Sequence, residues 1–119
     1  MFDKHIEQEI QSKGLVAPRV TPADIEANIK SEYYFLARQG VNGNGEGIEI
    51  SDDDHTTLAL LTFCVIVLRN GFTVTGESAC ASPENFDAEI GRKIARGNAI
   101  NKIWPLMGYA LKESLSSAK

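Results

Sequence analysis

Residues 61–78, LTFCVIVLRNGFTVTGES, decide the fold because they predict a β-hairpin. The first half is rich in β-branched residues, and the second half alternates between apolar and polar residues. Asn70-Gly71 between them is the strongest two-residue turn signal, in which Gly71 takes a positive φ. A helix over 57–69, closed by Gly71, is the competing interpretation. The β-branched run Val65–Val67 favours the strand.

A two-residue turn also fixes which side chains share a face of the hairpin. It predicts four opposed pairs on a mainly apolar face: Arg69 and Phe72, Val67 and Val74, Val65 and Gly76, Phe63 and Ser78. It leaves the other face with Cys64, Ile66 and Leu68 opposite Glu77, Thr75 and Thr73. Because the first strand is apolar on both faces, we expect helices or another subunit to cover both.

The chain before the hairpin predicts two helices. Residues 3–12 form a short helix that Gly14 ends, and an extended link follows over 14–20. A second helix starts with Thr21 as its cap and Pro22 in its first turn, and it runs to about Gly40. Its apolar face consists of Ile25, Ile29, Tyr33, Leu36 and Ala37.

The glycine- and aspartate-rich stretch 40–57 predicts a mobile surface loop, or a short strand containing Ile48 and Ile50. Since a two-stranded sheet is marginal alone, we expect further strands from this stretch or from a partner subunit. The chain is therefore expected to form a homodimer or a larger oligomer.

The last helix is expected to open at Ser82-Pro83-Glu84. Pro105 should kink it or start a new helix. One broad stripe should face the core: Phe86, Ile90, Ile94, Gly97, Ile100, Trp104, Met107 and Leu111. The predicted fold class is α+β, a small antiparallel sheet based on the β-hairpin and packed by an N-terminal helix and a long C-terminal helix. Residues 1–20 are an N-terminal segment, and 21–119 form one domain.

Composition narrows the class of function. The 119 residues suffice for one domain with a real core, and Lys and Arg (12) are fewer than Asp and Glu (16). This acidic balance disfavours a general duplex-DNA binder. Two cysteines make neither a zinc pattern nor a disulfide framework, and the longest apolar run is about half a membrane span. We expect a soluble, cytoplasmic protein without a membrane or a duplex nucleic-acid partner.

No motif predicts catalysis or a metal site. GESAC, residues 76–80, approaches a nucleophile elbow around Ser78, but Cys80 replaces the second glycine and no triad partners are evident. Cys80 is interpreted as a packed, unreactive thiol. The run Asp52–Asp54 beside His55 lacks the spacing of a calcium loop and is interpreted as a solvated acidic surface. We expect no enzyme activity and no cofactor.

Arg92 and Arg96 make the richest candidate site. They lie one turn apart on the last helix, beside its apolar stripe, in a locally basic segment. Two guanidiniums at this spacing are able to clamp a phosphate or a diphosphate. The structural alternative is a solvated helix face with ion pairs between successive turns.

A longer stretch carries a family resemblance. Residues 61–109, LTFCVIVLRNGFTVTGESACASPENFDAEIGRKIARGNAINKIWPLMGY, resemble a small family from tailed phages and prophages that is catalogued as gp-forty-nine-like. TPADIEANIKSEYYF (residues 21–35) also looks like the N-terminal helix of that family, so the resemblance covers about residues 20–111. It implies a phage origin and a place in the host bacterial cytoplasm, but no assigned activity.

A second, weaker resemblance concerns a hairpin followed by a helix with two arginines. This layout is similar to the phage sponges that defeat Thoeris immunity by binding cyclic ADP-ribose signals in pockets between subunits. It implies a non-catalytic counter-defence protein that sequesters a phosphorylated nucleotide. Arg92 and Arg96 would be the diphosphate ligands, with Phe86 or Phe72 stacking on the base and Asn85 nearby. The alternative is an accessory protein that binds and inhibits a host protein through its surface.

Overall fold

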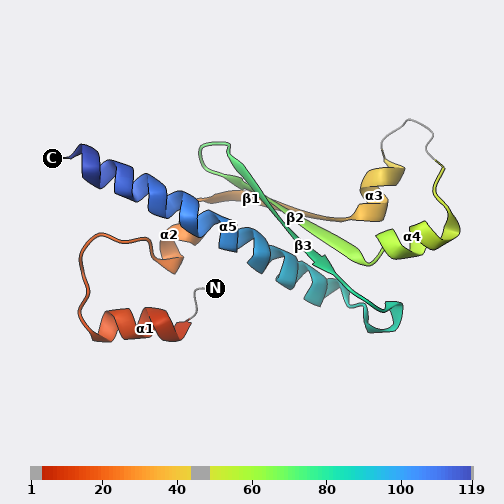
Figure 1. The fold of residues 1–119 in the computed structure, drawn as a ribbon, viewed down its shortest axis with the longest axis horizontal. Helices are drawn as coiled ribbons and strands as arrows, with labels where there is room; N and C mark the ends of the chain where they lie inside the picture. The colour runs from red at the N-terminus through yellow and green to blue at the C-terminus, as the bar shows by residue number, and fades with distance from the viewer. Residues whose placement is uncertain (1–3, 44–48, 119) are drawn as a thin grey trace.

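The computed structural model describes residues 4–43 and 49–118 of the chain. Its elements confirm the predicted α+β class (Figure 1). In chain order they are α1 (Lys4–Ser12), α2 (Pro22–Ala27), β1 (Ile29–Leu36), α3 (Ala37–Asn42), α4 (Asp52–Leu58), β2 (Leu61–Leu68), β3 (Thr73–Ala79), the 3₁₀ turn η1 (Pro83–Asn85) and α5 (Ala88–Ser117). None of the described helices is both long enough and apolar enough to cross a membrane.

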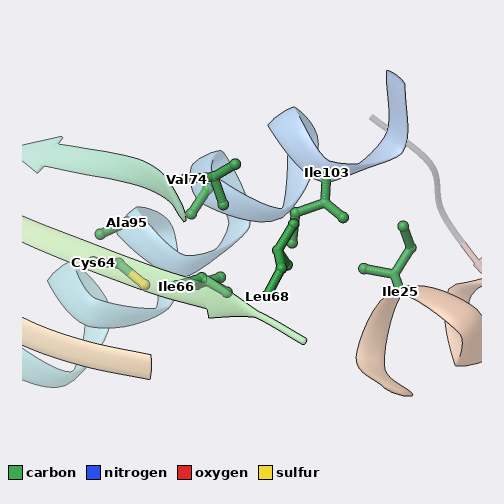
Figure 2. Packing of buried hydrophobic residues seen from close by; sticks show 8 residues of the cluster. Ile25, Cys64, Ile66, Leu68, Val74, Ala95 and Ile103 are labelled. Carbon is green, nitrogen blue, oxygen red and sulfur yellow. The ribbon is translucent and has the colours of Figure 1, made fainter. Parts of the chain in front are cut away.

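The three strands form one antiparallel sheet in the order β1-β2-β3, and α5 lies across one face of it (Figure 1). Between α5 and the sheet is the core, to which α2 adds Ile25 (Figure 2). Its buried members are Ile25, Cys64, Ile66, Leu68, Val74, Ala95, Ala99 and Ile103. The C-terminal part of α5 continues beyond the sheet, and the molecule measures 58 × 30 × 17 Å.

The hairpin forms as predicted, but its predicted register is wrong. Three residues make the loop, because Leu68 N–H donates to the Phe72 carbonyl (2.8 Å) and Gly71 N–H donates to the Leu68 carbonyl (2.9 Å). Only Gly71 has the predicted positive φ, +91°, whereas a two-residue primed turn needs one at Asn70 as well. The Asn70 side chain instead accepts the Phe72 N–H.

Because the register differs by one residue, each side chain of β3 lies on the opposite face of the sheet from the one predicted. Val74 lies opposite Ile66 and Gly76 opposite Cys64, so both face α5. Thr73, Thr75 and Glu77 lie on the other face, opposite Val67, Val65 and Phe63. The two faces are therefore more clearly separated than predicted, with apolar or small residues on the core side and the hydroxyls of Thr62 and Ser78 at one end of it.

The predicted long helix over 21–39 is also wrong beyond its first turns. Its start is confirmed, since Thr21 and Asp24 form a reciprocal capping box. The helix ends at Ala27, and Ile29–Leu36 is a strand paired with β2. The aromatic and β-branched residues of this segment favour a strand once an apolar partner strand is available. The third strand thus comes from this segment and not from 40–57.

Much of the predicted loop over 40–57 is helical. Ser51 caps α4 by accepting the Asp54 N–H at 3.1 Å, and the three aspartates fill the first turn, where a helix favours negative charge. Of the predicted short strand, Ile48 is outside the described residues and Ile50 belongs to no strand. At the N-terminus the first predicted helix is confirmed, and Gly14 ends it with a φ of +65°.

Helix α5 differs from the prediction in its start, continuity and buried face. Ser82-Pro83-Glu84 begins only η1, whereas Asp87 caps α5 by accepting the Ile90 N–H. The helix then continues through Pro105 to Ser117, so no second helix starts there. Its buried face is Gly91, Ala95, Ala99 and Ile103, while Ile90 and Ile94 of the predicted stripe are exposed. Trp104, predicted to be core, is half-buried at the core's edge with Ile100 and Met107.

Candidate functional site

Arg96 is not free to bind a ligand, because it joins α5 to α2 and β1. Its Nε donates to the carboxylate of Glu32 at 3.0 Å, and its Nη2 donates to that of Glu26 at 2.8 Å. The hydrogen bonds with Glu26, followed by those with Glu32, raise the pKa of the Arg96 guanidinium. Its side chain is 29% exposed. The guanidinium nitrogens of Arg96 are thus already engaged by these two carboxylates.

This ion-pair network continues into the sheet through neutral groups. The Tyr34 hydroxyl donates to Glu32 at 2.9 Å. Burial, and then this hydrogen bond, raise the pKa of Tyr34 well above its ordinary value. Burial likewise raises the pKa of the neighbouring Cys64 thiol. Both groups therefore stay protonated at neutral pH, and the network is structural in character.

Arg92 lies one turn earlier and lines a cavity of about 260 Å³. The cavity lies between the end of β1, the first turn of α3 and the first turns of α5. Its lining residues are Tyr34, Phe35, Leu36, Gln39, Thr62, Ala88 and Arg92. Arg92 is exposed and makes no hydrogen bond or ion pair within residues 4–43 and 49–118. Its guanidinium is thus available to an anion that enters the cavity.

Thr62 supplies the second unusual feature of this cavity. Thr62 is 3% exposed, and its Oγ1 has no hydrogen-bond partner among the residues that the structure describes. The hydroxyl lies against α5, since a β-carbon added to Gly91 would be 3.0 Å from Oγ1. A buried hydroxyl without a partner is costly, so such groups are uncommon and mark a place for a water or a ligand atom. Gln39, opposite, accepts the Leu36 N–H through its side-chain oxygen.

The other predicted ligand residues do not line this cavity. Asn85 and Phe86 lie in and after η1, and Phe86 is half-buried there. Phe72 lies beside the hairpin loop, at the end of the β2–β3 ladder away from η1. The structure therefore separates Phe72 from Phe86 by the length of the hairpin. Phe35 and Tyr34 are the aromatic residues beside Arg92.

Sequence reasoning located Arg92 but missed its neighbours. The available signal for Thr62 was its hydroxyl in the otherwise apolar strand LTFCVIVL. Tyr34, Phe35 and Leu36 were placed on a helix, so their approach to Arg92 was not foreseeable. Chemically, the cavity offers a guanidinium and aromatic surface, with the unpaired Thr62 hydroxyl buried directly behind its lining. This combination is suited to holding an anionic group beside a ring.

Other sequence features have structural roles. Ser78 is half-buried on β3, opposite Thr62. The Cys80 thiol donates to the Ser82 carbonyl at 3.2 Å and is partly buried. Within the part of the chain that the structure describes, no three His, Cys, Asp or Glu side chains are grouped as a metal site would require.

Comparison with known proteins gives a family and nothing finer. No curated protein and no solved structure matches the chain. Nothing supports the resemblance to the Thoeris sponges. One family model matches residues 20–115, which include every element from α2 to most of α5 and leave out α1. The chain belongs to the phage protein family described as N4 Gp49/phage Sf6 gene 66.

Proposed function

We propose that this phage protein is a non-catalytic binding protein that sequesters a small phosphorylated nucleotide, with Arg92 as the ligand of its phosphate. A cyclic nucleotide or a cyclic ADP-ribose-type signal belongs to this chemical class. On this proposal the protein acts in counter-defence, by lowering the free concentration of such a signal in the host.

The observation that carries the proposal is the coincidence of Arg92 with the unpaired Thr62 hydroxyl in one cavity. An unpaired guanidinium attracts a phosphate, and an unpaired buried hydroxyl gains a hydrogen bond when a ligand arrives. The N-terminus of α5 itself is not the anion site, since the Asp87 carboxylate already accepts the Ile90 N–H.

The size of the cavity limits what it encloses. At about 260 Å³ it is slightly smaller than the usual pocket for a drug-sized ligand. It therefore accommodates a phosphoryl group with an adjoining ring, and the rest of a larger nucleotide extends past Phe35. Arg96 contributes by holding α5 against β1, which fixes the position of Arg92 one turn away.

Isothermal titration calorimetry tests this proposal. The probes are ADP-ribose, cyclic ADP-ribose isomers, cyclic dinucleotides and inorganic diphosphate. We expect Arg92→Ala to weaken binding of the best probe roughly 10- to 150-fold, because a charge-assisted hydrogen bond contributes about 1.5–3 kcal/mol. Arg92→Lys should also weaken it, since a point charge does not reproduce the planar fork.

Lys102→Ala is the matched control, because it removes one exposed positive charge from the same helix away from the cavity. It should leave affinity within about twofold at moderate salt. No heat with any probe, or equal affinities for the parent and Arg92→Ala, would refute the proposal.

A second candidate function is inhibition of a host protein through surface contact. It is favoured by the apolar residues on the part of α5 that extends beyond the sheet. Leu106, Tyr109 and Leu115 are exposed there, with Tyr109 at 70%. Met107 and Leu111 line a groove of about 580 Å³ beside Val20 and Ala27. Leu106 and Tyr109 lie on one side of this part of α5, and Met107, Leu111 and Leu115 lie on the other. Exposed apolar residues on a helix end of this kind are typical of protein-binding surfaces.

Pull-down from host lysate with the parent and with Tyr109→Glu tests this candidate. A host protein retained by the parent, lost with Tyr109→Glu and kept with Arg92→Ala would favour it over nucleotide binding. Retention of the same proteins by all three would contradict it.

A further inference from the structure

The sheet has an apolar face that α5 does not cover. Three rows of side chains form this open face: Ser31, Val67 and Thr73; Tyr33, Val65 and Thr75; Phe35, Phe63 and Glu77. The rings of Phe35 and Phe63 stack with their centroids 5.3 Å apart. An antiparallel sheet that faces water normally alternates apolar and polar side chains, whereas β2 places Phe63, Val65 and Val67 on this side.

Little in the described chain shields the open face. Helix α3 contacts β1 and β2, and Gly40 lies near the Phe35 ring, so α3 protects only that end. Tyr33 remains 62% exposed and Phe35 37%. Helix α5 packs on the opposite face, against β2 and β3. Among residues 4–43 and 49–118, nothing therefore covers the middle of the open face.

We infer that the open face is the interface of a homodimer, in which it packs on the same face of a second copy. The charges favour a second copy over a different partner. Glu77 is the one charged residue in the three rows, and it lies at a corner on the edge strand β3. A face with a single charge at its corner offers little to an oppositely charged partner, whereas its central apolar residues are complementary to the same residues of a second copy.

The areas involved fit a reversible dimer. Two strands of eight residues and one of seven, spaced about 4.8 Å apart, give a face of roughly 500 Å² with its side chains. Two such faces would remove about 1,000 Å², which is near the lower limit for a specific interface. The chain also exposes 8291 Å², whereas a compact monomer of this mass exposes about 6,300 Å². The first comparison fits a weak dimer, and the second shows that the single chain leaves more surface exposed than a compact monomer does.

Sedimentation equilibrium of the full chain, from about 1 to several hundred micromolar, tests the inference. We expect the parent to reach the mass of two subunits. Tyr33→Glu should weaken dimerisation at least about tenfold, because it places a charge in the middle of an apolar interface. Tyr33 is exposed on an edge strand, so circular dichroism should show that the variant folds.

Tyr109→Glu is the matched control, since the same change is made at an exposed tyrosine on α5, away from the sheet. It should leave the dimer unchanged. A parent that stays monomeric over the whole concentration range would overturn the inference, and the open face would then belong to a different protein. Dissociation by Tyr109→Glu but not by Tyr33→Glu would also overturn it and would place the interface on α5. Arg92→Ala should not change the mass, so failure here is separate from failure of ligand binding.

Discussion

Gly76 of β3 lies directly against the backbone of Ala99 in α5, with no room for a β-carbon between them. A β-carbon built on Gly76 would overlap the Ala99 nitrogen and the Ala95 carbonyl oxygen. Ala95 and Ala99 are themselves completely buried. The long helix thus approaches the sheet through its smallest residues, and this contact sets the distance between the two layers of the fold.

Gly76→Ala is therefore expected to be strongly destabilising. The added methyl group meets backbone atoms that have no alternative rotamer, so the cost should be about 3 kcal/mol or more, above most overpacked core substitutions. Urea denaturation measures it. Gly97→Ala is the control, since a β-carbon there meets nothing within 4 Å and should stabilise the helix by about 0.5–1 kcal/mol. Similar stabilities for the two variants would contradict the close contact.

The same contact explains why the buried face of α5 was not predicted. Hydrophobic periodicity gives weight to large apolar residues and so selected Ile90 and Ile94. The structure instead buries the small residues at 91, 95 and 99, because only they permit the close approach at Gly76. Which side of a helix packs against a sheet depends on the shape of the sheet surface that it meets. The sequence of the helix alone does not contain that shape.

Gly71→Val should destabilise the hairpin by about 1–3 kcal/mol. The φ of Gly71 is +91°, where a β-branched residue is strained. Thermal unfolding followed by circular dichroism is the measurement. Gly71→Asn should cost less, because asparagine tolerates positive φ better than other residues. A melting temperature for Gly71→Val equal to that of the parent would be inconsistent with this loop.

The hairpin also shows the limit of turn signals. Asn70-Gly71 is compatible with a two-residue turn and with the three-residue loop that forms, because both need a positive φ at the glycine. The two differ by one residue in register, and this decides whether Val74 or Thr73 faces the core. Pairing Val74 with Ile66 under α5 buries more apolar surface, so tertiary packing selects the longer loop.

Arg96→Ala should destabilise the fold by about 1–2 kcal/mol, since it leaves the half-buried Glu32 without its cation. The value is discounted for the partial exposure of the pair. Arg92→Ala, one turn away and without a partner in the described chain, should stay within about 0.5 kcal/mol of the parent. Denaturation of both variants in urea distinguishes them. Equal losses of unfolding free energy in the two variants would mean that the ion pairs of Arg96 contribute nothing to stability.

The roles of the two arginines were not separable from sequence. The two arginines lie one turn apart on the same side of α5. The sequence therefore predicted the same position for both, beside the apolar stripe of that helix. The carboxylates that engage Arg96 are 70 and 64 residues earlier in the chain. Glu32 reaches Arg96 only because residues 29–36 form a strand. The i, i+4 spacing of the apolar residues in this segment had predicted a helix instead.

Stability should fall at alkaline pH partly because of Tyr34. Burial, followed by the hydrogen bond to Glu32, raises its pKa in the fold above the ordinary value of 10.0. A group whose pKa is higher in the folded than in the unfolded state stabilises the fold while it is protonated. This contribution is complete below the pKa of the unfolded state and is lost as the pH rises above that pKa. Tyr34→Phe should therefore show a smaller loss of stability than the parent as the pH rises from about 9 to about 11.5. Equal losses would exclude Tyr34 as a contributor.

Thr62→Val should make the unliganded protein more stable and a poorer binder. Its hydroxyl is buried without a partner in the described part of the chain, which costs about 1–3 kcal/mol, and valine has nearly the same shape. We therefore expect a gain of about 1 kcal/mol in urea denaturation together with weaker binding of the best nucleotide probe. Thr62→Ser is the control, because it keeps the hydroxyl and removes a methyl group, so it should lose stability and retain binding. A loss of stability in Thr62→Val would show that the hydroxyl is already satisfied, for example by an ordered water, and would remove the second of the two groups on which the cavity's ligand chemistry rests.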